Sequence, residues 1–259
     1  MNPDIFYQLI LGIIQGITEW LPLSSSGMTT LAMTNIFGIT DIGLIIHQAL
    51  FLHLGTFFAA LIYFRKEVKS ILSFKKKTRK VLNFLIISTI ITSILGIIIL
   101  KFLINNLEMT GKTITFVVGF LLLITGGMQF ASRKKGLRTE KEIKNSDGIV
   151  AGLAQGLAVL PGVSRSGITT STLLLKKFND TSALRLSFLM SLPIVLLGNI
   201  ILNLPDFAKV FTSYSIIGLV TAFAFGILTI HLLMKLSKKI NFAWFAIIFA
   251  ILMMISVLF

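Results

Sequence analysis

Apolar residues dominate six stretches of the chain that are each about as long as a membrane-spanning helix. A helix needs about 20 mostly apolar residues to cross about 30 Å of hydrocarbon. The stretches are residues 44–64, 82–104, 113–131, 183–203, 213–234 and 242–258. Short polar joints separate them, as expected for a chain that crosses a bilayer repeatedly. The pattern therefore predicts an all-α, polytopic membrane protein with six transmembrane helices.

Two further apolar regions, residues 5–38 and 148–176, are interrupted near their middles. The interruptions are rich in Gly, Pro and Ser and run from Pro22 to Gly27 and from Pro161 to Gly167. Each half is too short to span a bilayer, and a non-helical break survives there only when it is buried in protein or lines water. We therefore predict that each region is a re-entrant helical hairpin, which enters the membrane and returns to the same side.

Lys and Arg cluster in the joints at 65–80, 132–147 and 235–239. The first joint has eight basic residues and one acidic residue. Cytoplasmic loops carry an excess of Lys and Arg, so we predict that all three joints are cytoplasmic. Six crossings and two re-entrant hairpins satisfy this condition. The first hairpin then enters from outside and the second from inside, so the two hairpins are opposed.

The two interrupted regions resemble each other. Residues 15–27 align without gaps on residues 155–167, at an offset of 140, and five of thirteen positions are identical. Each copy precedes three predicted spanning helices, and an odd number of crossings inverts the second copy relative to the first. We predict a single membrane domain over 1–259, with inverted repeats at about 1–131 and 148–259 and a basic cytoplasmic linker at 132–147. The alternative is a chance similarity between two Gly- and Ser-rich breaks.

Composition agrees with lipid as the main solvent. Apolar residues make up 55% of the chain and charged residues 13%, against about 45–50% and about 25% in soluble domains. The net charge of +14 would suggest nucleic acid on a soluble chain. Here the basic residues lie in short runs between apolar stretches and form no patch interleaved with the aromatic residues that stack on bases, so we exclude nucleic acid as a partner. The chain has no cysteine, which excludes disulfides and thiolate metal ligands.

Together the two breaks have the chemistry of a phosphate-binding site. A helix that restarts after a break offers free N–H groups and the positive end of its dipole. Glycines allow close approach of the backbone, and serine hydroxyls donate hydrogen bonds. Arg165 adds a permanent charge whose planar fork suits phosphate oxygens. If the breaks share one cavity, a phosphate group is expected to bind between them.

Glu19 and Arg165 are charged residues inside the broken apolar regions, where charge is costly and usually functional. Glu19 could bind a divalent cation or act as a general base. The alternatives are an Arg165 that snorkels to the inner interface and a Glu19 that is only its structural partner. Ser25 is a candidate nucleophile, although serines in membrane helices often only satisfy backbone carbonyls. His53 could reach the cavity from the first spanning helix or be an ordinary packed polar residue.

At these motifs the sequence resembles the undecaprenyl-diphosphate phosphatase family of the bacitracin-resistance type. The family pattern is Glu-Gly-x-Thr-Glu-Phe-Leu-Pro-x-Ser-Ser-x-Gly-His, followed far downstream by Pro-Gly-x-Ser-Arg-Ser-Gly. This chain carries the first element from Gln15 to Met28 and the second in full from Pro161 to Gly167. The resemblance extends to chain length, hairpin placement and helix count.

The resemblance implies an enzyme of the cell membrane that hydrolyses a C55-isoprenyl diphosphate to the monophosphate, mostly at the outer face, with support from Mg²⁺ or Ca²⁺. By position it implies that Glu19, Ser25 and Arg165 are catalytic and that Glu19 is also the cation ligand. The substrate-binding residues expected at the site are Gln15, Ser24, Ser26, Gly27, His53, Gly162, Ser164, Ser166 and Gly167. The expected partners are the polyprenyl diphosphate and membrane lipids, and a homodimer is left open.

Two departures from the family pattern affect the expected chemistry. Gln15 stands where the family has its first glutamate, and Met28 stands where it has a histidine. Proton transfer would then come from Glu19, His53 or water. The departures keep a polyprenyl-phosphate translocase without hydrolysis open as a second function, because an inverted repeat suits alternating access. A small-solute transporter is a weaker third hypothesis, because nothing beyond the anion site indicates another substrate.

Overall fold

The computed structural model describes residues 3–106, 111–131, 136–160, 162–205 and 211–236, together with seven residues between 244 and 255. Within this part of the chain the regular structure is helical, and the only strand-like pairing is an isolated bridge between Arg138 and Phe178. Pro161 and most of the stretch predicted at 242–258 lie outside the described residues.

Helices occupy five of the six predicted apolar stretches, although the stretch at 113–131 contributes only a shorter apolar segment, Gly119–Met128. The helices are α1 (Pro3–Thr18), α2 (Ser25–Leu31), η1 (Ala32–Ile36), α3 (Ile42–Tyr63), α4 (Arg65–Leu72), α5 (Arg79–Asn106), α6 (Gly111–Ala131), η2 (Glu140–Glu142), α7 (Asn145–Leu157), α8 (Arg165–Leu175), α9 (Asp180–Gly198), η3 (Asn199–Asn203) and α11 (Ser215–Leu236). Four of them are long and apolar enough to cross a membrane, namely Gly43–Tyr63, Arg79–Ile99, Asp180–Asn203 and Ser215–Leu236. The joint predicted at 65–80 differs from expectation, because it contains the short helix α4.

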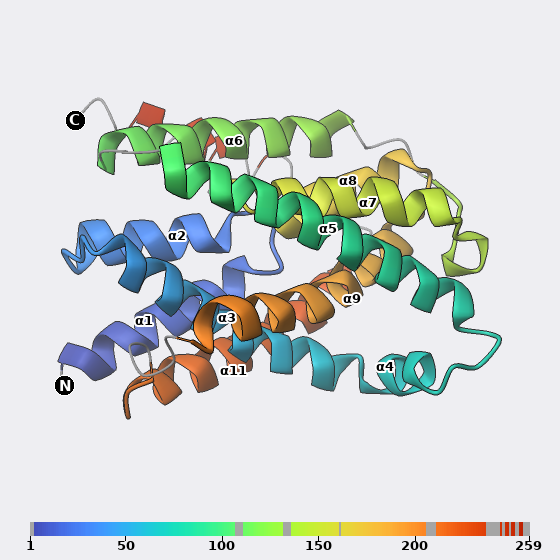
Figure 1. Cartoon of the computed structure of the whole chain (residues 1–259), viewed down its shortest axis with the longest axis horizontal. Helices are drawn as coiled ribbons and strands as arrows, with labels where there is room; N and C mark the ends of the chain where they lie inside the picture. Colours follow the sequence, from blue (N-terminus) through green and yellow to red (C-terminus); the bar gives the residue numbers. More distant parts are fainter. Residues whose placement is uncertain are drawn as a thin grey trace.

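The two interrupted regions form helical hairpins that each begin and end at one end of the molecule (Figure 1). In the first, the ring of Tyr7 near the start of α1 packs 4.8 Å from that of Phe37, just after η1. In the second, the backbone N–H of Arg138, before α7, donates to the carbonyl of Lys177, after α8, at 2.9 Å. The first hairpin starts at the left of Figure 1 and the second at the right, so they approach from opposite ends.

The tips of the hairpins meet in the middle of the molecule. Ser24 and Ser164 are the N-caps of α2 and α8, and each hydroxyl accepts the N–H of the glycine three residues later at 3.2 Å. Gly162 has a φ of +98°, which a residue without Cβ adopts easily. The Gly162 N–H donates to Ser24 Oγ at 3.3 Å, and Ser166 Oγ donates to the carbonyl of Leu21 at 2.6 Å. The two breaks are therefore hydrogen-bonded to each other.

Small residues let each hairpin pack closely on a long helix from the other half of the chain. A Cβ on Gly12 of α1 would lie 2.5 Å from the carbonyl oxygen of Gly218 in α11. A Cβ on Gly152 of α7 would lie 2.8 Å from the carbonyl oxygen of Ser88 in α5. Such backbone contact between helices depends on small residues at the interface. It holds both hairpins firmly enough to position the residues at their tips.

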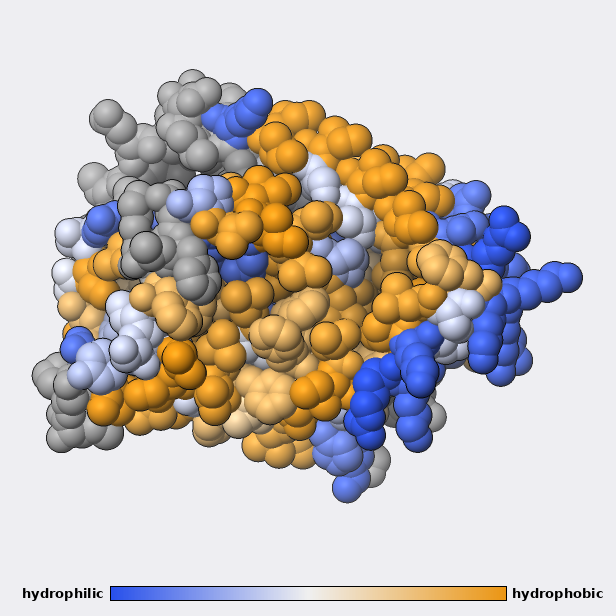
Figure 2. All heavy atoms as spheres, turned by 60° about the horizontal axis from the view of Figure 1, so that its bottom comes forward, coloured by the Kyte–Doolittle hydropathy of each residue, from blue (hydrophilic) through white to orange (hydrophobic). Residues whose placement is uncertain are grey.

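One end of the molecule is markedly hydrophilic. Figure 2 shows a broad apolar surface and hydrophilic side chains gathered at the right-hand end. That end carries α4 and the turn before α5, whose side chains from Lys75 to Lys77 are all exposed. This arrangement is what a helical protein needs when lipid covers its sides and water covers its ends.

Candidate active site

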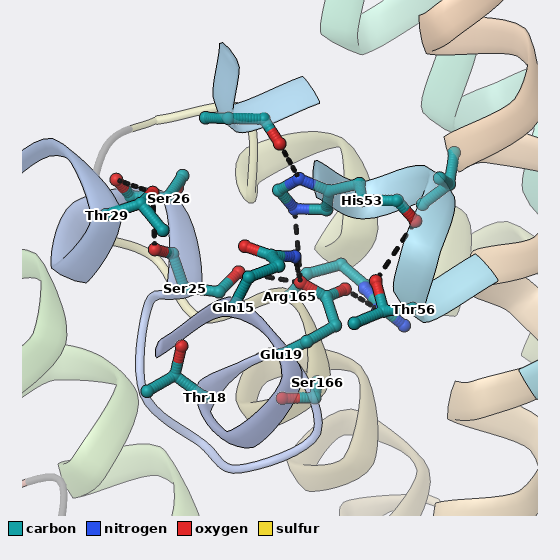
Figure 3. Close-up of polar contacts among 12 residues, drawn as sticks. Gln15, Thr18, Glu19, Ser25, Ser26, Thr29, His53, Thr56, Arg165 and Ser166 are labelled. Atoms are coloured by element: carbon teal, nitrogen blue, oxygen red, sulfur yellow. Dashed lines mark hydrogen bonds and ion pairs between the residues drawn. The ribbon is translucent and has the colours of Figure 1, made fainter. Parts of the chain in front are cut away.

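Glu19 lies at the centre of a buried polar cluster between the hairpin tips (Figure 3). One carboxylate oxygen, Oε1, forms an ion pair with Nη2 of Arg165. The other, Oε2, accepts hydrogen bonds from Ser25 Oγ at 2.6 Å and from Gln15 Nε2 at 3.0 Å. His53 Nε2 lies 3.1 Å from the same oxygen. A buried carboxylate requires such partners, because burying it unpaired is very costly.

Four separate elements supply these side chains. Gln15 lies in the last turn of α1, Glu19 directly follows that helix, and Ser25 is the first residue of α2. His53 comes from the middle of α3, and Arg165 is the first residue of α8. The cluster therefore exists only because the tips of the two hairpins meet beside α3.

Arg165 is held on several sides. Its Nη1 donates to the backbone carbonyl of Ser187 in α9 at 3.3 Å, while Nη2 faces Glu19. Its guanidinium carbon lies 5.6 Å from the centre of the Trp20 ring, within the range of a cation–π interaction. These contacts fix the plane of the guanidinium and contradict the alternative in which Arg165 snorkels to the interface.

His53 has a defined tautomer. Its Nδ1 lies 2.6 Å from the carbonyl of Ala49, and a carbonyl can only accept, so Nδ1 is the donor. Nε2 therefore faces Oε2 of Glu19, and the contact is attractive when a proton lies between the two atoms. His53 and Ser25 thus contact the same carboxylate oxygen of Glu19.

The remaining predicted site residues build the crossing between the tips rather than the Glu19 cluster. The hydroxyls of Ser164 and Ser166 lie 3.4 Å and 2.6 Å from the carbonyl of Leu21. Ser26 Oγ is 3.3 Å from Ser24 Oγ and is half-buried. The glycines of this group, all at the two tips, are Gly27, Gly162 and Gly167. In this structure these residues support the cluster, and their predicted contact with substrate stays a prediction.

Comparison with known proteins decides the family. A family model for bacitracin resistance protein BacA matches residues 8–255. The chain belongs to this family. It is 45% identical over 250 residues to an undecaprenyl-diphosphatase of Methanococcoides burtonii, covering 92% of this chain and 93% of the relative. Proteins with the same name from Haloarcula marismortui and Syntrophotalea carbinolica are 37% and 34% identical, each covering at least 93% of both chains.

The divalent cation expected in a BacA-family member has few protein ligands here. No group of three or more His, Asp or Glu side chains that could hold a metal lies among the described residues. Both oxygens of Glu19 already face donors, and Mg²⁺ and Ca²⁺ require several oxygen ligands. The buried Oε1 of Gln15 is the one amide oxygen of the cluster without a hydrogen-bond partner among the described residues. These side chains do not by themselves fit a resident cation.

Sequence patterns did not identify three groups that complete the site. The carbonyls of Ala49 and Ser187 orient His53 and Arg165, and the Trp20 ring lies beside the guanidinium. Backbone carbonyls carry no side-chain signal. An apolar ring such as Trp20, which is 2% exposed, resembles any other core residue in the sequence.

Proposed function

We propose that this chain hydrolyses undecaprenyl diphosphate, or a closely related polyprenyl diphosphate, to the monophosphate and inorganic phosphate. The observation that carries the proposal is the buried cluster of Ser25, Glu19 and Arg165 where the two hairpin tips meet. Three relatives named undecaprenyl-diphosphatase, which match nearly the whole chain, support the substrate. The reaction returns a lipid carrier to the synthesis of cell-envelope glycans.

The geometry favours attack by Ser25. Its hydroxyl donates to Glu19 at 2.6 Å, so the carboxylate can take the proton as Oγ bonds to the terminal phosphorus. The bond from that phosphorus to the bridging oxygen breaks, and the lipid monophosphate leaves. Water then adds to phosphorus, the Oγ–P bond breaks and Ser25 regains a proton, which releases inorganic phosphate.

Arg165 supplies the positive charge that phosphoryl transfer requires. Two of its five N–H groups contact Glu19 and Ser187, which leaves donors for phosphate oxygens. The N-terminus of α8, where Arg165 is the first residue, adds the positive end of the helix dipole. Fixed positive groups of this kind stabilise the charge on a transferring phosphoryl group.

We propose that a divalent cation binds only together with the substrate. Mg²⁺ is commonly bound by one or two carboxylates together with substrate phosphates, so a cation would arrive with the diphosphate. The protein oxygens that could contact such a cation are those of Glu19 and the unpartnered Oε1 of Gln15. Bound there, the cation would neutralise diphosphate charge. Loss of phosphate release in a chelator, with recovery on adding Mg²⁺ or Ca²⁺, would support this role, and full activity in the chelator would contradict it.

We further propose a cell-membrane topology of six crossings and two opposed re-entrant hairpins, related as inverted repeats, with the site open to the outside. The hairpin ends that return to one end of the molecule support the re-entrant arrangement. Matching cap hydrogen bonds at Ser24 and Ser164 support the repeat, at the offset of 140 residues. The basic joints support a cytoplasmic position for the right-hand end in Figure 1. A homodimer stays a prediction.

Phosphate release by the purified full-length protein tests the reaction. Undecaprenyl diphosphate in detergent is the substrate, and Arg165→Gln is compared with Arg185→Gln, which removes a half-exposed arginine paired only loosely with Glu140 at 3.6 Å. Arg165→Gln is expected to lower kcat at least about 100-fold, as loss of a charge-stabilising donor does elsewhere, while Arg185→Gln stays near wild type. An inactive wild-type protein, or an Arg165→Gln variant as active as wild type, would contradict the proposal.

The translocase hypothesis makes a separate prediction. Proteoliposomes with labelled polyprenyl phosphate on one side report movement between leaflets, and the same vesicles report phosphate release from the diphosphate. Movement without hydrolysis would favour the translocase. The Ser25–Glu19 hydrogen bond favours hydrolysis, because a translocase that only binds phosphate does not require a serine hydroxyl hydrogen-bonded to a carboxylate base.

A further inference from the structure

Helix α4 turns sharply away from α3. Only Phe64 separates them, and Figure 1 draws α4 nearly end-on where α3 is seen from the side. Phe64 is 2% exposed, and Ile71 on the inner face of α4 is 6% exposed. Both side chains belong to the same core cluster. These buried side chains hold the short helix across the end of α3.

The outer face of α4 mixes two cations with two apolar side chains. Arg65, Val68, Lys69 and Leu72 follow the spacing i, i+3, i+4, i+7, which places them on one stripe of a helix. Arg65 and Lys69 are exposed and lie one turn apart. Leu72 is 62% exposed, which is unusual for leucine unless lipid or a partner covers it.

This stripe forms one wall of a groove of about 500 Å³, and the last turns of α3 form the other through Leu61 and Ile62. Nη1 of Arg65 donates to the carbonyl of Ile62 at 3.1 Å, which keeps the guanidinium at the rim. Ile62 is itself 44% exposed on the apolar side of α3. The groove is therefore continuous with a surface that lipid chains would cover if α3 crosses the membrane.

Charge around the groove favours an anion. The segment 65–80 carries eight basic residues and one acidic residue, and that residue, Glu67, does not line the groove. An inorganic anion would gain nothing from contact with the apolar walls of the groove. A neutral apolar ligand would leave the two cations at the rim without a counter-charge.

We propose that this groove binds an anionic phospholipid of the surrounding membrane. One acyl chain lies against Leu61, Ile62, Val68 and Leu72, and the phosphate contacts Arg65 and Lys69. Ile62, an α3 residue at the groove, lies nine residues or roughly 14 Å along the helix from His53, at about 1.5 Å per residue. The site is therefore separate from the Glu19 cluster and does not depend on the proposed reaction.

Lipid binding to the full-length protein in a neutral detergent tests the site. Binding of dioleoyl phosphatidylglycerol and dioleoyl phosphatidylcholine is measured by native mass spectrometry. Each lipid is added to wild type, to Arg65→Gln/Lys69→Gln and to Lys75→Gln/Lys76→Gln. The last variant removes the same charge from exposed positions that do not line the groove. A thermal melt without lipid confirms that each variant is folded.

Wild type and the Lys75/Lys76 variant are expected to bind the anionic lipid at least about tenfold more tightly than the neutral lipid, and the Arg65/Lys69 variant is expected to lose this preference. An equal loss in both double variants would mean that binding reflects overall charge, which overturns the proposal. Equal affinity of wild type for the two lipids would overturn it as well. Glycerol 3-phosphate is the probe without acyl chains, and binding as tight as that of the lipid would identify an anion site instead.

Discussion

At the scale of single residues, the site is organised by one carboxylate. Glu19 is 5% exposed, and its two oxygens face a guanidinium, a hydroxyl, an amide and an imidazole. Removing one partner of a buried ion pair typically costs about 3–5 kcal/mol, because the other charge is left uncompensated. Each partner therefore matters for the fold as well as for the chemistry, and variants at the site need a folding control.

Ser25→Ala is expected to lower phosphate release roughly 1,000-fold or more, because it removes the oxygen that would attack phosphorus. Thr34→Ala is the control in the same hairpin, since the Thr34 hydroxyl donates to the carbonyl of Thr30 at 3.0 Å rather than to Glu19, and it should stay within about threefold of wild type because the contact is an ordinary hydrogen bond. Steady-state assays with undecaprenyl diphosphate measure both. A Ser25→Ala protein that keeps wild-type turnover would assign the attack to water.

His53→Gln is expected to lower kcat by about 10- to 100-fold with little change in KM, because glutamine can still donate to Glu19 but cannot exchange a proton with it. His47→Gln is the control on the same helix, where His47 Nδ1 contacts Asn203 at 2.8 Å. Equal activity of the two variants would mean that His53 is only a packing residue.

At the scale of elements, glycine spacing decides how the hairpins are held. Gly12 and Gly16 of α1 face α11, while Gly152 and Gly156 of α7 face α5, again at an offset of 140. Each hairpin thus uses a small-xxx-small pattern to pack on a long helix of the other half. The serine N-caps then start α2 and α8 at matching positions, so the two tips can meet.

Gly152→Leu is expected to destabilise the protein by about 1–3 kcal/mol, because its Cβ would lie 2.8 Å from the Ser88 carbonyl oxygen and α5 would have to move. The thermal unfolding temperature in detergent should fall by roughly 2–10 °C. Gly127→Leu in α6 is the control, because a Cβ there meets nothing within 4 Å, and its Tm should be unchanged or higher. A matching loss in both variants would contradict the packing argument.

At the scale of the whole molecule, the two hairpins contribute different chemistry to one site. The first supplies Glu19 and Ser25, whereas the corresponding positions of the second, 140 residues later, are Val159 and Arg165. The acid and the hydroxyl therefore come from one hairpin and the permanent positive charge from the other. The asymmetry agrees with a single proposed phosphate site, whereas two identical hairpins would offer two equivalent sites.

Single cysteines test the proposed topology, because the natural chain has none. Thr40, before α3, and Lys76, after α4, are both exposed and flank one predicted crossing. Thr40→Cys is expected to react with a membrane-impermeant maleimide in intact cells, and Lys76→Cys and Lys141→Cys only after the membrane is opened. Labelling of all three from one side would contradict the orientation.

The long apolar helices could be predicted from the sequence alone, because crossing lipid requires a local composition that can be counted along the chain. The predicted stretches at 44–64 and 183–203 correspond to Gly43–Tyr63 and Asp180–Asn203. The serine- and glycine-rich breaks, Glu19 and Arg165 were likewise visible, because charge and chain breaks are conspicuous in apolar segments. The short helix α4 was missed, since its eight residues mix charged, polar and apolar side chains and resemble a polar joint.

Tertiary structure decided which of these groups meet. The ion pair joins residues 146 positions apart, and composition does not determine how two hairpins are rotated about their axes. The same rotation brings His53 to the oxygen that Ser25 contacts and brings the Ser187 carbonyl to Arg165. The rotation of the hairpins also brings the hydroxyls of Ser164 and Ser166 to the carbonyl of Leu21. These hydroxyls are used there because a buried backbone carbonyl needs a hydrogen-bond donor.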